Sequence, residues 1–591
     1  MDELKKHETP NRGIIKNLKS TYKYAKSGRK YLFFFFIANI LLTVISVIVP
    51  VLSAKRLLAL TNGAFEKLLV FIFLIFLIEI TRNIVNYVSV NIYNKFYYGI
   101  RKNFQIELTR ETLKLTENEL NTNSSGVFIE RINNDTDNLT DIFTDLIDYS
   151  TFIVGNIGIL IAVFLINVYI GLAYVLFMIV IIIYNKFSSN INYENRKKWK
   201  KSREKTGGFI SEIVRGATDV KVLDAEESFL EKASEYMEDT NKVSYHYQKN
   251  KARLRLLGGS IRDIGDFGIS ILIYIFLSTG VISIEGVLVI YNYHNQLTWT
   301  ADWIERIYEI LKQFNLSANR IFGILEDSEF EKEKFGTKKL NNFKGNIEFR
   351  NVSFSYDNNI PVIKNMNLKI NANETVGFVG QSGAGKSTIF SLISALNRVT
   401  TGKILFDGND INDLDKSSIR GNLSVISQNA YIFNMSILDN LRVVKMNATL
   451  EEIKEACHLA ALDEFIESLP EKYNTIVGEG GVTLSGGQKQ RLAIGRALLL
   501  KTEILLFDEA TSALDNETQT KIQAAINNLK GEYTILIIAH RLSTVINCDK
   551  IFVIDDGKVE SVGTHEYLIN HSDVYNTLYK KETKEVDEKV K

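Results

Sequence analysis

The sequence ETVGFVGQSGAGKST, residues Glu374–Thr388, predicts a buried strand followed by a glycine-rich turn into a helix. Gly380–Ser387 match the pattern G-x-x-x-x-G-K-[ST] at every fixed position. Glycines let backbone N–H groups wrap a phosphate chain, while Lys386 neutralises phosphate oxygens and Ser387 can ligate Mg²⁺. The predicted phosphate-binding loop consists of Gly380, Gln381, Ser382, Gly383, Ala384, Gly385, Lys386, Ser387 and Thr388.

A second glycine-rich stretch, LSGGQ, lies further along the chain at Leu484–Gln488. At the start of a helix, its backbone N–H groups and the positive helix end would point at an anion. The γ-phosphate of an ATP molecule is the anion that fits. The predicted contacts to this phosphate come from Ser485, Gly486, Gly487 and Gln488.

A third motif, EILLFDEATSALD, begins with the apolar run Ile504–Phe507, which predicts a buried strand. Asp508 and Glu509 follow directly. We expect Asp508 to hold Mg²⁺ through water and Glu509 to polarise the attacking water as a general base. Two adjacent carboxylates could instead bind a metal for another reason, although the upstream phosphate loop favours the first interpretation.

Three polar residues between and after these motifs extend the predicted site. Gln428 has an amide that could reach both Mg²⁺ and the attacking water, and Asp515 follows the carboxylate pair at a spacing suited to signalling across a dimer. His540 follows a strand predicted over Tyr533–Ile538, where an imidazole could hydrogen-bond the γ-phosphate. A structural role is the alternative for a histidine in that position.

An aromatic residue precedes the phosphate loop. Tyr356 ends the β-rich stretch IEFRNVSFSY, which begins at Ile347. Its ring could stack on adenine. The alternative is an ordinary core tyrosine.

The first half of the chain has a different character, with long apolar runs separated by basic segments. Six runs are long enough, or nearly so, to cross about 30 Å of hydrocarbon at about 1.5 Å per residue. The first is too long for a cleaved signal peptide. The predicted spans are Leu32–Leu52, Leu68–Val90, Tyr149–Ile166, Ile170–Tyr184, Ile261–Leu277 and Val281–Ile304.

Lysine and arginine predict the orientation of these spans. The leader before the first span carries nine, residues 91–144 six and residues 185–260 sixteen, against three in residues 55–67. Basic residues are enriched in cytoplasmic segments, so we expect both termini to be cytoplasmic. Amphipathic patterns predict that the helices continue into the cytosol, where Phe128–Leu139 and Ile213–Val222 are expected to touch the second half.

Polar groups inside the predicted spans should avoid lipid and face the bundle or a water-filled cavity. Glu79 with Arg82, and Arg262 with Asp266, have the spacing of intrahelical pairs. The sixth span differs, because its polar and aromatic residues have no charge to pair within the helix. For these residues a cavity wall and simple interhelical hydrogen bonding remain equal alternatives: Tyr291, Asn292, Tyr293, His294, Asn295, Gln296, Trp299 and Trp303.

Composition sets the domain plan. The 591 residues exceed one compact core, the net charge is +1, and the two cysteines, Cys457 and Cys548, predict no disulfide framework. The predicted fold is an all-α polytopic membrane domain of six transmembrane helices with long cytoplasmic extensions, followed by an α/β P-loop ATPase domain. The predicted boundaries are 1–30 for a cytoplasmic N-terminal segment, 31–325 for the membrane domain, 326–345 for a linker, 346–582 for the ATPase domain and 583–591 for a charged tail.

These motifs resemble those of the ATP-binding cassette (ABC) transporters of the exporter type. The resemblance covers nearly the whole chain, and the ATPase motifs carry it more specifically than the membrane half. TIVGEGG is particular to exporters within this family, and there Glu479 would contact the intracellular loops. The motifs that occur in the family's order are Tyr356, the phosphate loop, Gln428, TIVGEGG at Thr475–Gly481, LSGGQ, ILLFDEATSALD and His540.

The resemblance implies a half-transporter that binds ATP and Mg²⁺ and works with a second half-transporter. Each ATP would lie between the phosphate loop of one chain and the LSGGQ of the other, with Lys386, Gln428, Glu509 and His540 as the catalytic set. A homodimer is expected because every motif is present, and a heterodimer stays open. Mg²⁺ would be held by Ser387, Gln428 and Asp508.

The implied function is ATP-driven export of an amphipathic or hydrophobic solute, such as a drug, lipid or peptide. The alternatives are an ATP-gated channel or sensor partner without active pumping, and an importer that uses the exporter fold. We expect a multi-pass protein of a cell membrane, specifically a bacterial plasma membrane, in contact with membrane lipids and not with nucleic acid.

Overall fold

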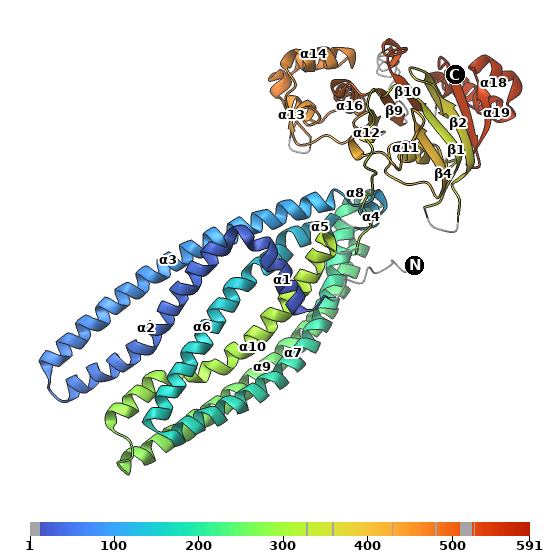
Figure 1. The fold of residues 1–591 in the computed structure, drawn as a ribbon. Helices are drawn as coiled ribbons and strands as arrows, with labels where there is room; N and C mark the ends of the chain where they lie inside the picture. The colour runs from blue at the N-terminus through green and yellow to red at the C-terminus, as the bar shows by residue number, and fades with distance from the viewer. Residues whose placement is uncertain are drawn as a thin grey trace. The chain divides into compact units, whose positions relative to one another are not determined.

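A computed structural model describes residues 12–590 apart from 124, 327–328, 357–359, 428–429, 479–480, 509–519, 521–522, 525 and 540 (Figure 1). The chain forms two compact units. The first comprises Met1–Lys114 and Asn123–Phe330, and the second comprises Leu115–Thr122 and Glu331–Lys591.

Six long helices make up most of the described part of the first unit. They are α2 (Arg29–Thr61), α3 (Phe65–Thr112), α6 (Thr136–Ile166), α7 (Val168–Arg215), α9 (Glu226–Ser278) and α10 (Ile284–Leu325). Each predicted span lies on one of them. The shorter segments of this unit are α1 (Ile14–Tyr24), η1 (Ala25–Gly28), α5 (Ser125–Glu130), η2 (Arg131–Asp135) and α8 (Ala217–Val222).

Side-chain caps set two of the tight turns between these helices. Asn167 accepts hydrogen bonds from the backbone N–H groups of Tyr169 and Ile170 and so begins α7. Ser283 accepts from the N–H of Gly286. Because this serine is the N-cap of α10, the sixth span begins at Ile284 and not at the predicted Val281.

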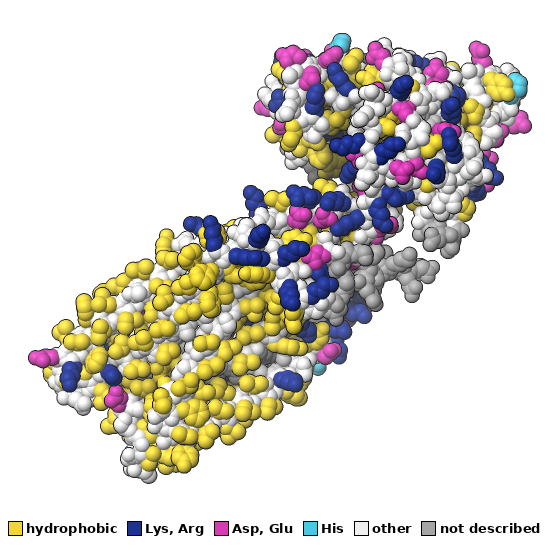
Figure 2. Space-filling model, viewed as in Figure 1, with side chains coloured by type: hydrophobic (Ala, Val, Ile, Leu, Met, Phe, Trp, Pro, Cys, Tyr) yellow, Lys and Arg dark blue, Asp and Glu magenta, His cyan; other side chains and the backbone are white. Residues whose placement is uncertain are grey.

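Four helical stretches in the described residues are long and apolar enough to cross a membrane. They are Ile14–Thr61, Phe65–Thr112, Ser125–Ile166 and Val168–Arg215. α9 and α10 are not among them, because their predicted spans hold the polar residues noted above. Figure 2 shows hydrophobic side chains along the length of the helical unit, with charged side chains gathered at its ends.

Two glycines bring α9 close to α7. A Cβ atom at Gly265 would lie 2.1 Å from Phe177 Cε2, and one at Gly258 would lie 2.7 Å from Tyr184 Cε1. The two aromatic rings therefore occupy the space that side chains at these positions would fill. Phe177 belongs to a buried apolar cluster to which α2, α6, α7, α9 and α10 contribute.

A buried ion pair joins η2 to the segment that follows α10. Arg131 of η2 donates from Nη2 to Glu329 Oε1 at 2.7 Å and from Nη1 to Glu329 Oε2 at 2.9 Å. Asp135, also in η2, accepts from the hydroxyl of Ser317 in α10 at 2.7 Å. Within the first unit, η2 and α6 pack on α10, and the expected contact of residues 128–139 with the ATPase domain stays a prediction.

A different part of the same connection belongs to the second unit. The Thr116 N–H donates to the Glu331 carbonyl, and the Glu331 N–H donates to Glu119 Oε1. Leu115 forms a β-bridge with Lys332. The segment that joins the second unit is therefore Leu115–Thr122, which contains α4 (Glu117–Thr122) and precedes the predicted stretch.

The second unit contains a six-stranded and a four-stranded sheet (Figure 1). The six-stranded sheet has the order β12-β11-β3-β10-β9-β6 and is parallel apart from β12, and the antiparallel sheet has the order β2-β1-β4-β5. β7 and β8 form a separate two-stranded antiparallel sheet. The strands are β1 (Ile347–Phe354), β2 (Ile363–Ile370), β3 (Thr375–Val379), β4 (Thr401–Phe406), β5 (Asn409–Asp410), β6 (Leu423–Ile426), β7 (Met435–Ser436), β8 (Ile476–Val477), β9 (Ile504–Asp508), β10 (Thr534–Ile538), β11 (Lys550–Asp555) and β12 (Lys558–Gly563).

Helices complete this α/β unit around two separate apolar cores. One core includes β1, β2, β4 and α11, and the other includes α13, α14 and α16. The fold class predicted from the sequence, a helical domain followed by an α/β domain, is confirmed. The described helices of the second unit, besides α4, are α11 (Lys386–Ile393), α12 (Lys416–Arg420), α13 (Ile437–Arg442), α14 (Leu450–Leu459), α15 (Asp463–Ser468), η3 (Lys472–Asn474), α16 (Gly486–Leu500), η4 (Leu542–Thr544), α18 (His565–His571) and α19 (Asp573–Val590).

Candidate nucleotide-binding site

The strands that precede the phosphate loop, Gln428, Glu509 and His540 end at one edge of the six-stranded sheet. The register places Phe378 of β3 beside Ile538 of β10, and Ile538 beside Asp508 of β9. β6 continues the row, since Ile426 pairs with Phe507. Carboxyl ends of parallel strands form the usual ligand edge of such sheets.

The phosphate-loop residues follow β3 at that edge. β3 is buried along its whole length, and α11 begins at Lys386, as the sequence predicts. Gly383 and Gly385 have φ values of 83° and 99°, which L side chains rarely adopt. A Cβ at Gly380 would lie 2.1 Å from the carbonyl oxygen of Ile554. The glycines are therefore needed for the course of the backbone.

The lysine of the loop folds back over it. Lys386 Nζ donates to the carbonyl oxygens of Gly380 and Gln381, each at 2.9 Å, and the residue is 6% exposed. These bonds hold the ammonium group at the loop. Ser387 is exposed next to it, so its hydroxyl is accessible.

Tyr356 approaches the loop from the antiparallel sheet. Its hydroxyl lies 3.1 Å from Thr388 Oγ1, and its ring meets Phe354 edge-on at 4.9 Å. The residue is 53% exposed. An aromatic face with this exposure, fixed beside the loop, is suited to stacking on a base.

Asp508 is half-buried at the end of β9. The other polar residues predicted for this edge, Gln428, Glu509, Asp515 and His540, lie outside the described residues. So does Glu479. The strands before Gln428, Glu509 and His540, namely β6, β9 and β10, all end at the edge that carries the phosphate loop.

The LSGGQ stretch forms the capped N-terminus of α16. Ser485 Oγ accepts from the Gln488 N–H at 3.3 Å, and Gln488 Oε1 accepts from the Ser485 N–H at 2.8 Å. This reciprocal pair is a capping box. Ser485 and Gly486 are exposed and Gly487 is buried. The helix end is thus formed and accessible, while the side chain of Gln488 is engaged in the cap.

The phosphate loop and LSGGQ belong to different apolar cores. Ala384, Ile389 and Phe390 lie in the core with the antiparallel sheet. Leu484, Leu492 and Ile494 lie in the other core, where α16 contacts α13, α14 and β6. Each half of the predicted site is therefore supported by its own core.

No sequence motif indicated a set of buried hydrogen bonds in the second core, made by Asn440 and Arg496 and called the Asn440 clamp below. Asn440 of α13 is fully buried, and its amide donates to the carbonyls of Phe433, Met435 and Ser436 while its oxygen accepts from the Phe433 N–H. Arg496 of α16 donates to the Asn440 and Tyr431 carbonyls. Burial lowers the pKa of Arg496. Neither residue stands in a recognisable pattern, so the contact is apparent only in the fold.

Comparison with protein families explains the order of these motifs. Residues 363–512 match the family model described as ABC transporter, and residues 32–301 match the ABC transporter transmembrane region. The chain belongs to the ABC transporter family. Its transmembrane region precedes its ABC domain, as expected from the sequence.

Relatives support the same assignment. The chain is 44% identical over 262 residues to the "ATP-dependent lipid A-core flippase" of Escherichia coli K12, and it shows the same identity to the protein of that name from Shigella flexneri. Each match covers 44% of this chain and 45% of the relative, so the similar region spans about half the length of these curated proteins.

A solved structure shares the fold across nearly the whole chain. It is titled "Structure of a bacterial Atm1-family ABC exporter with ATP bound", and it superposes with a TM-score of 0.82 at 22% identity, covering 94% of this chain and 99% of that one. The arrangement of long helices followed by an ABC domain is thus that of a known ABC transporter structure.

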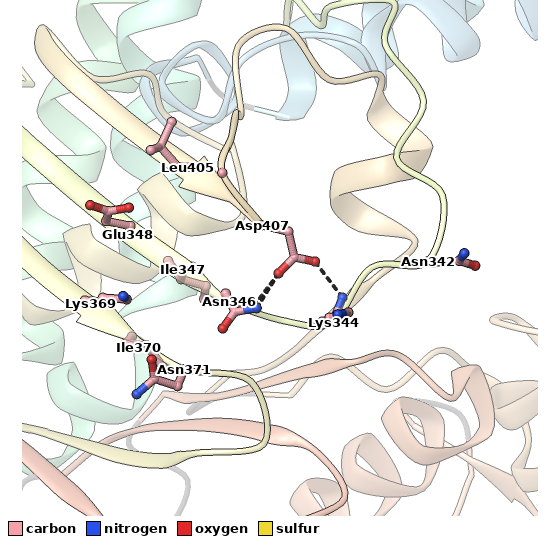
Figure 3. A pocket seen from close by; sticks show the side chains of 11 residues that line it. Asn342, Lys344, Asn346, Ile347, Glu348, Lys369, Ile370, Asn371, Leu405 and Asp407 are labelled. Carbon is pink, nitrogen blue, oxygen red and sulfur yellow. Dashed lines mark hydrogen bonds between the residues drawn. The ribbon is translucent and has the colours of Figure 1, made fainter.

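Two further pockets lie in the ABC unit. A cavity of about 230 Å³ is lined by Tyr356 together with Thr116, Asn118, Glu331, Asn397 and Arg398. A polar pocket of about 500 Å³ lies on the antiparallel sheet. There Asp407 accepts hydrogen bonds from the backbone N–H groups of Lys344 and Asn346 and from the Asn346 side-chain amide (Figure 3). In the second pocket Asp407 anchors the start of the domain to the β4–β5 turn, away from the nucleotide motifs.

Proposed function

We propose that this chain is one half of a dimeric ATP-driven exporter that moves an amphipathic or lipid-like solute across a membrane. The carrying observation is the exposed, fully capped N-terminus of α16, which belongs to a different core from the phosphate loop. A helix end of this kind binds phosphate. A second chain, bound face to face, would bring its phosphate loop to this helix end.

In this proposal, each residue at the sheet edge has its own role in binding or hydrolysing ATP. Lys386 and the loop backbone would hold the β- and γ-phosphates, and Tyr356 would stack on the base. Glu509 would take a proton from the attacking water, Gln428 would orient that water, and His540 would bond the γ-phosphate. Asp515 would signal nucleotide contact across the dimer.

The residues present fit Mg²⁺. Ser387 offers an exposed hydroxyl, Asp508 offers a carboxylate, and Gln428 an amide oxygen, and Mg²⁺ prefers oxygen ligands. When bound, Mg²⁺ would supply positive charge to the phosphates. The protein groups would position the water and the nucleotide.

The membrane half supports transport of a solute from the cytoplasmic side. The excess of Lys and Arg before the first span and in residues 185–260 supports cytoplasmic termini and a cytoplasmic ABC unit. The relatives named as lipid A-core flippases favour a lipid-like cargo. ATP-driven closure of the ABC units and their release would alternate the access of the cavity.

Mixing two inactive variants tests the shared site. Lys386→Ala removes the loop cation and Ser485→Ala removes the cap that contacts the neighbour's phosphate. A mixed dimer has one site with both defects and one intact site, so we expect ATPase activity to return on co-assembly in lipid nanodiscs. Each variant alone should stay inactive. If activity did not return in dimers shown to contain both chains, the site would not be shared between subunits.

A further inference from the structure

The short helix α1 has three chemically distinct faces. At about 100° per residue, its side chains fall into three stripes along the helix. One stripe is apolar, one is basic, and one is polar without charge. The stripes are Ile14, Ile15, Leu18 and Tyr22; Lys16, Lys19 and Lys23; and Asn17, Ser20, Thr21 and Tyr24.

The polar stripe of α1 is the buried one. Asn17 and Thr21 are completely buried, whereas Ile15 is 72% exposed. A surface helix in water buries its apolar stripe and exposes its amides and hydroxyls. The reversed burial indicates that the apolar stripe of α1 faces an apolar medium instead of water.

Hydrogen bonds attach the polar stripe to one face of α10. Asn17 Nδ2 donates to Oδ1 of Asn315 and to Oδ1 of Asn319, each at 2.8 Å. The Ser20 hydroxyl donates to Glu326 Oε2 at 3.1 Å. These three partners share one face of the helix, because they are four and seven residues apart.

Arg12 adds to this attachment from just before α1. Its Nη2 donates to Glu326 Oε2 at 2.5 Å, and its guanidinium lies 4.8 Å from the centroid of the Phe322 ring. Its backbone N–H donates to Asn319 Oδ1 at 3.3 Å. Polar contacts therefore join α1 to the last turns of α10, the helix after which the chain continues to the ABC unit.

The basic stripe has no carboxylate to pair with. Residues 14–31 carry six lysines and arginines and neither Asp nor Glu. Lys16, Lys19 and Lys23 are exposed, and none of them forms an ion pair within the part of the chain that the structure describes. A stripe of cations that the protein does not neutralise is suited to an anionic surface.

Charged groups inside the predicted spans differ from these lysines, because they have partners on the protein. Glu79 and Arg82 pair at 2.5 Å, as their spacing predicts. The predicted partner of Asp266 was Arg262, but its Oδ1 lies 3.1 Å from Nε2 of His294 on α10. The neighbours of the α1 lysines must come from outside the described chain.

The position of α1 in the chain places it at the surface of the predicted bilayer. Only residues 25–31 separate it from the predicted span at Leu32, a distance of ~10 Å along a helix. Its own 11 residues extend over ~16 Å, which is too short to cross a hydrocarbon core of about 30 Å. η1 separates α1 from α2, and the two helices run in different directions (Figure 1).

A lipid surface satisfies both outward stripes of α1 at once. Short helices with an apolar stripe beside a lysine stripe bind in the plane of the bilayer surface, and their affinity combines apolar burial with attraction to anionic lipids. Zwitterionic headgroups carry no net charge, so they would match only the apolar stripe. The lysines therefore favour anionic headgroups.

We propose that α1 binds anionic lipid headgroups through Lys16, Lys19 and Lys23, and that this binding stabilises the last turns of α10 through Asn17. The membrane half would thereby respond to the charge of the surrounding lipid. The lipid acts here as a ligand and not as the transported solute. The site is separate from the ATP motifs.

A spin label at Ile15→Cys tests where the apolar stripe lies. Both native cysteines are buried, so the label attaches to the new thiol in the full-length protein in nanodiscs. We expect the label to collide more often with oxygen, which concentrates in hydrocarbon, than with a water-soluble nickel chelate. Asn570→Cys, at an exposed position of the ABC unit, is the control and should show the reverse. The proposal is wrong if the label at position 15 behaves like that at position 570, or if its spectrum is broadened by the label of a second copy.

Amide hydrogen exchange measures the effect of lipid charge on α10. The full-length protein is compared in nanodiscs of phosphatidylcholine alone and in nanodiscs that also contain phosphatidylglycerol. We expect phosphatidylglycerol to slow exchange in residues 315–326 severalfold, and added salt to reduce this effect because salt screens exposed charges. Equal exchange in the two lipids would overturn the proposal. The measurement needs no ATP, so this failure is distinct from a failure of the proposed export function.

Charge-neutralising variants test the basic stripe. The first variant carries three substitutions in α1: Lys16→Gln, Lys19→Gln and Lys23→Gln. Its matched control removes three exposed charges from α7: Lys197→Gln, Lys198→Gln and Lys201→Gln. We expect the α1 variant to lose the effect of phosphatidylglycerol and the α7 variant to keep it. An effect that survives in the α1 variant would show that these lysines are not the lipid-binding groups.

Asn17→Ala separates lipid binding from its effect on α10. The outward stripes are unchanged in this variant, so a label at position 15 should remain in lipid while phosphatidylglycerol no longer slows exchange in residues 315–326. A full lipid effect in Asn17→Ala would contradict the role given to Asn17. Lys19→Gln alone, which should weaken the effect, carries the charge test if the triple variant fails to assemble.

Discussion

At the residue scale, the site depends on side chains whose partners fix their positions. Lys386 is tied to two carbonyls of its own loop, Tyr356 to Thr388, and Ser485 to Gln488. The sequence singles out Lys386 and Ser485 because phosphate binding requires a fixed spacing along the chain, and it indicates Tyr356 only through the motifs around it. The sequence did not indicate Asn440 or Arg496, because their partners are backbone carbonyls that no motif specifies.

The base assignment predicts a specific loss in one variant. Glu509→Gln keeps the size of the side chain but removes its ability to take a proton, so ATP turnover should fall by on the order of 10² or more while ATP binding remains. Turnover and nucleotide binding are measured separately on the same preparation. Glu503→Gln, an exposed glutamate just before β9, is the control and should behave as wild type. Unchanged turnover in Glu509→Gln would remove Glu509 as the base.

Two substitutions at Tyr356 separate the contribution of its ring from that of its hydroxyl. Tyr356→Ala removes the stacking surface, so KM for ATP should rise about tenfold, the lower part of the range for one stacked base. Tyr356→Phe loses only the contact with Thr388 and should stay within about twofold of wild type. Equal effects of the two substitutions would show that the hydroxyl, and not the ring, matters. The measurement is ATPase rate against ATP concentration.

At the element scale, α13 and α16 are joined by the Asn440 clamp. The residues that this clamp holds, 431–436, begin three positions after Gln428 in the sequence. A buried amide with several backbone partners keeps this segment in one conformation, because each partner left unsatisfied costs about 1–3 kcal/mol. The clamp thereby links the end of β6 to the helix that begins with LSGGQ.

Removing the clamp should loosen that segment. We expect Asn440→Ala to lower the thermal unfolding midpoint of the full-length protein and to increase proteolytic cleavage within residues 430–436. Asn570→Ala removes an exposed amide that bonds only its own helix, and it should change neither measurement. Equal protease sensitivity in the two variants would contradict the role given to Asn440.

At the scale of the whole molecule, the proposed dimer predicts proximity between residues on different chains. Both native cysteines are buried, and burial raises the pKa of each thiol to about 12. They should therefore remain unreactive toward thiol reagents in the folded protein, because the thiolate is the reactive form. Cross-linking through cysteines introduced at exposed motif residues can therefore be measured without reaction of the native cysteines.

A double variant, Ser382→Cys with Ser485→Cys, places one thiol in the phosphate loop and one in LSGGQ. We expect a short thiol-to-thiol cross-linker to produce covalent dimers, more of them with ATP present. Either single variant should give few, since each motif would face the other motif and not its own copy. Cross-linked monomers without dimers would show that the two motifs meet within one chain.

The sequence by itself determined the apolar runs, the phosphate loop, LSGGQ and the carboxylate strand, because hydrophobic periodicity and phosphate chemistry act over neighbouring residues. It also placed β3 and the start of α11 correctly. The tertiary structure decided which distant residues meet. It assigned Leu115–Thr122 to the ABC unit, packed η2 and α6 on α10, and brought Asp266 to His294 instead of Arg262. Such contacts join separate elements, and their energies depend on packing and burial that no local pattern contains.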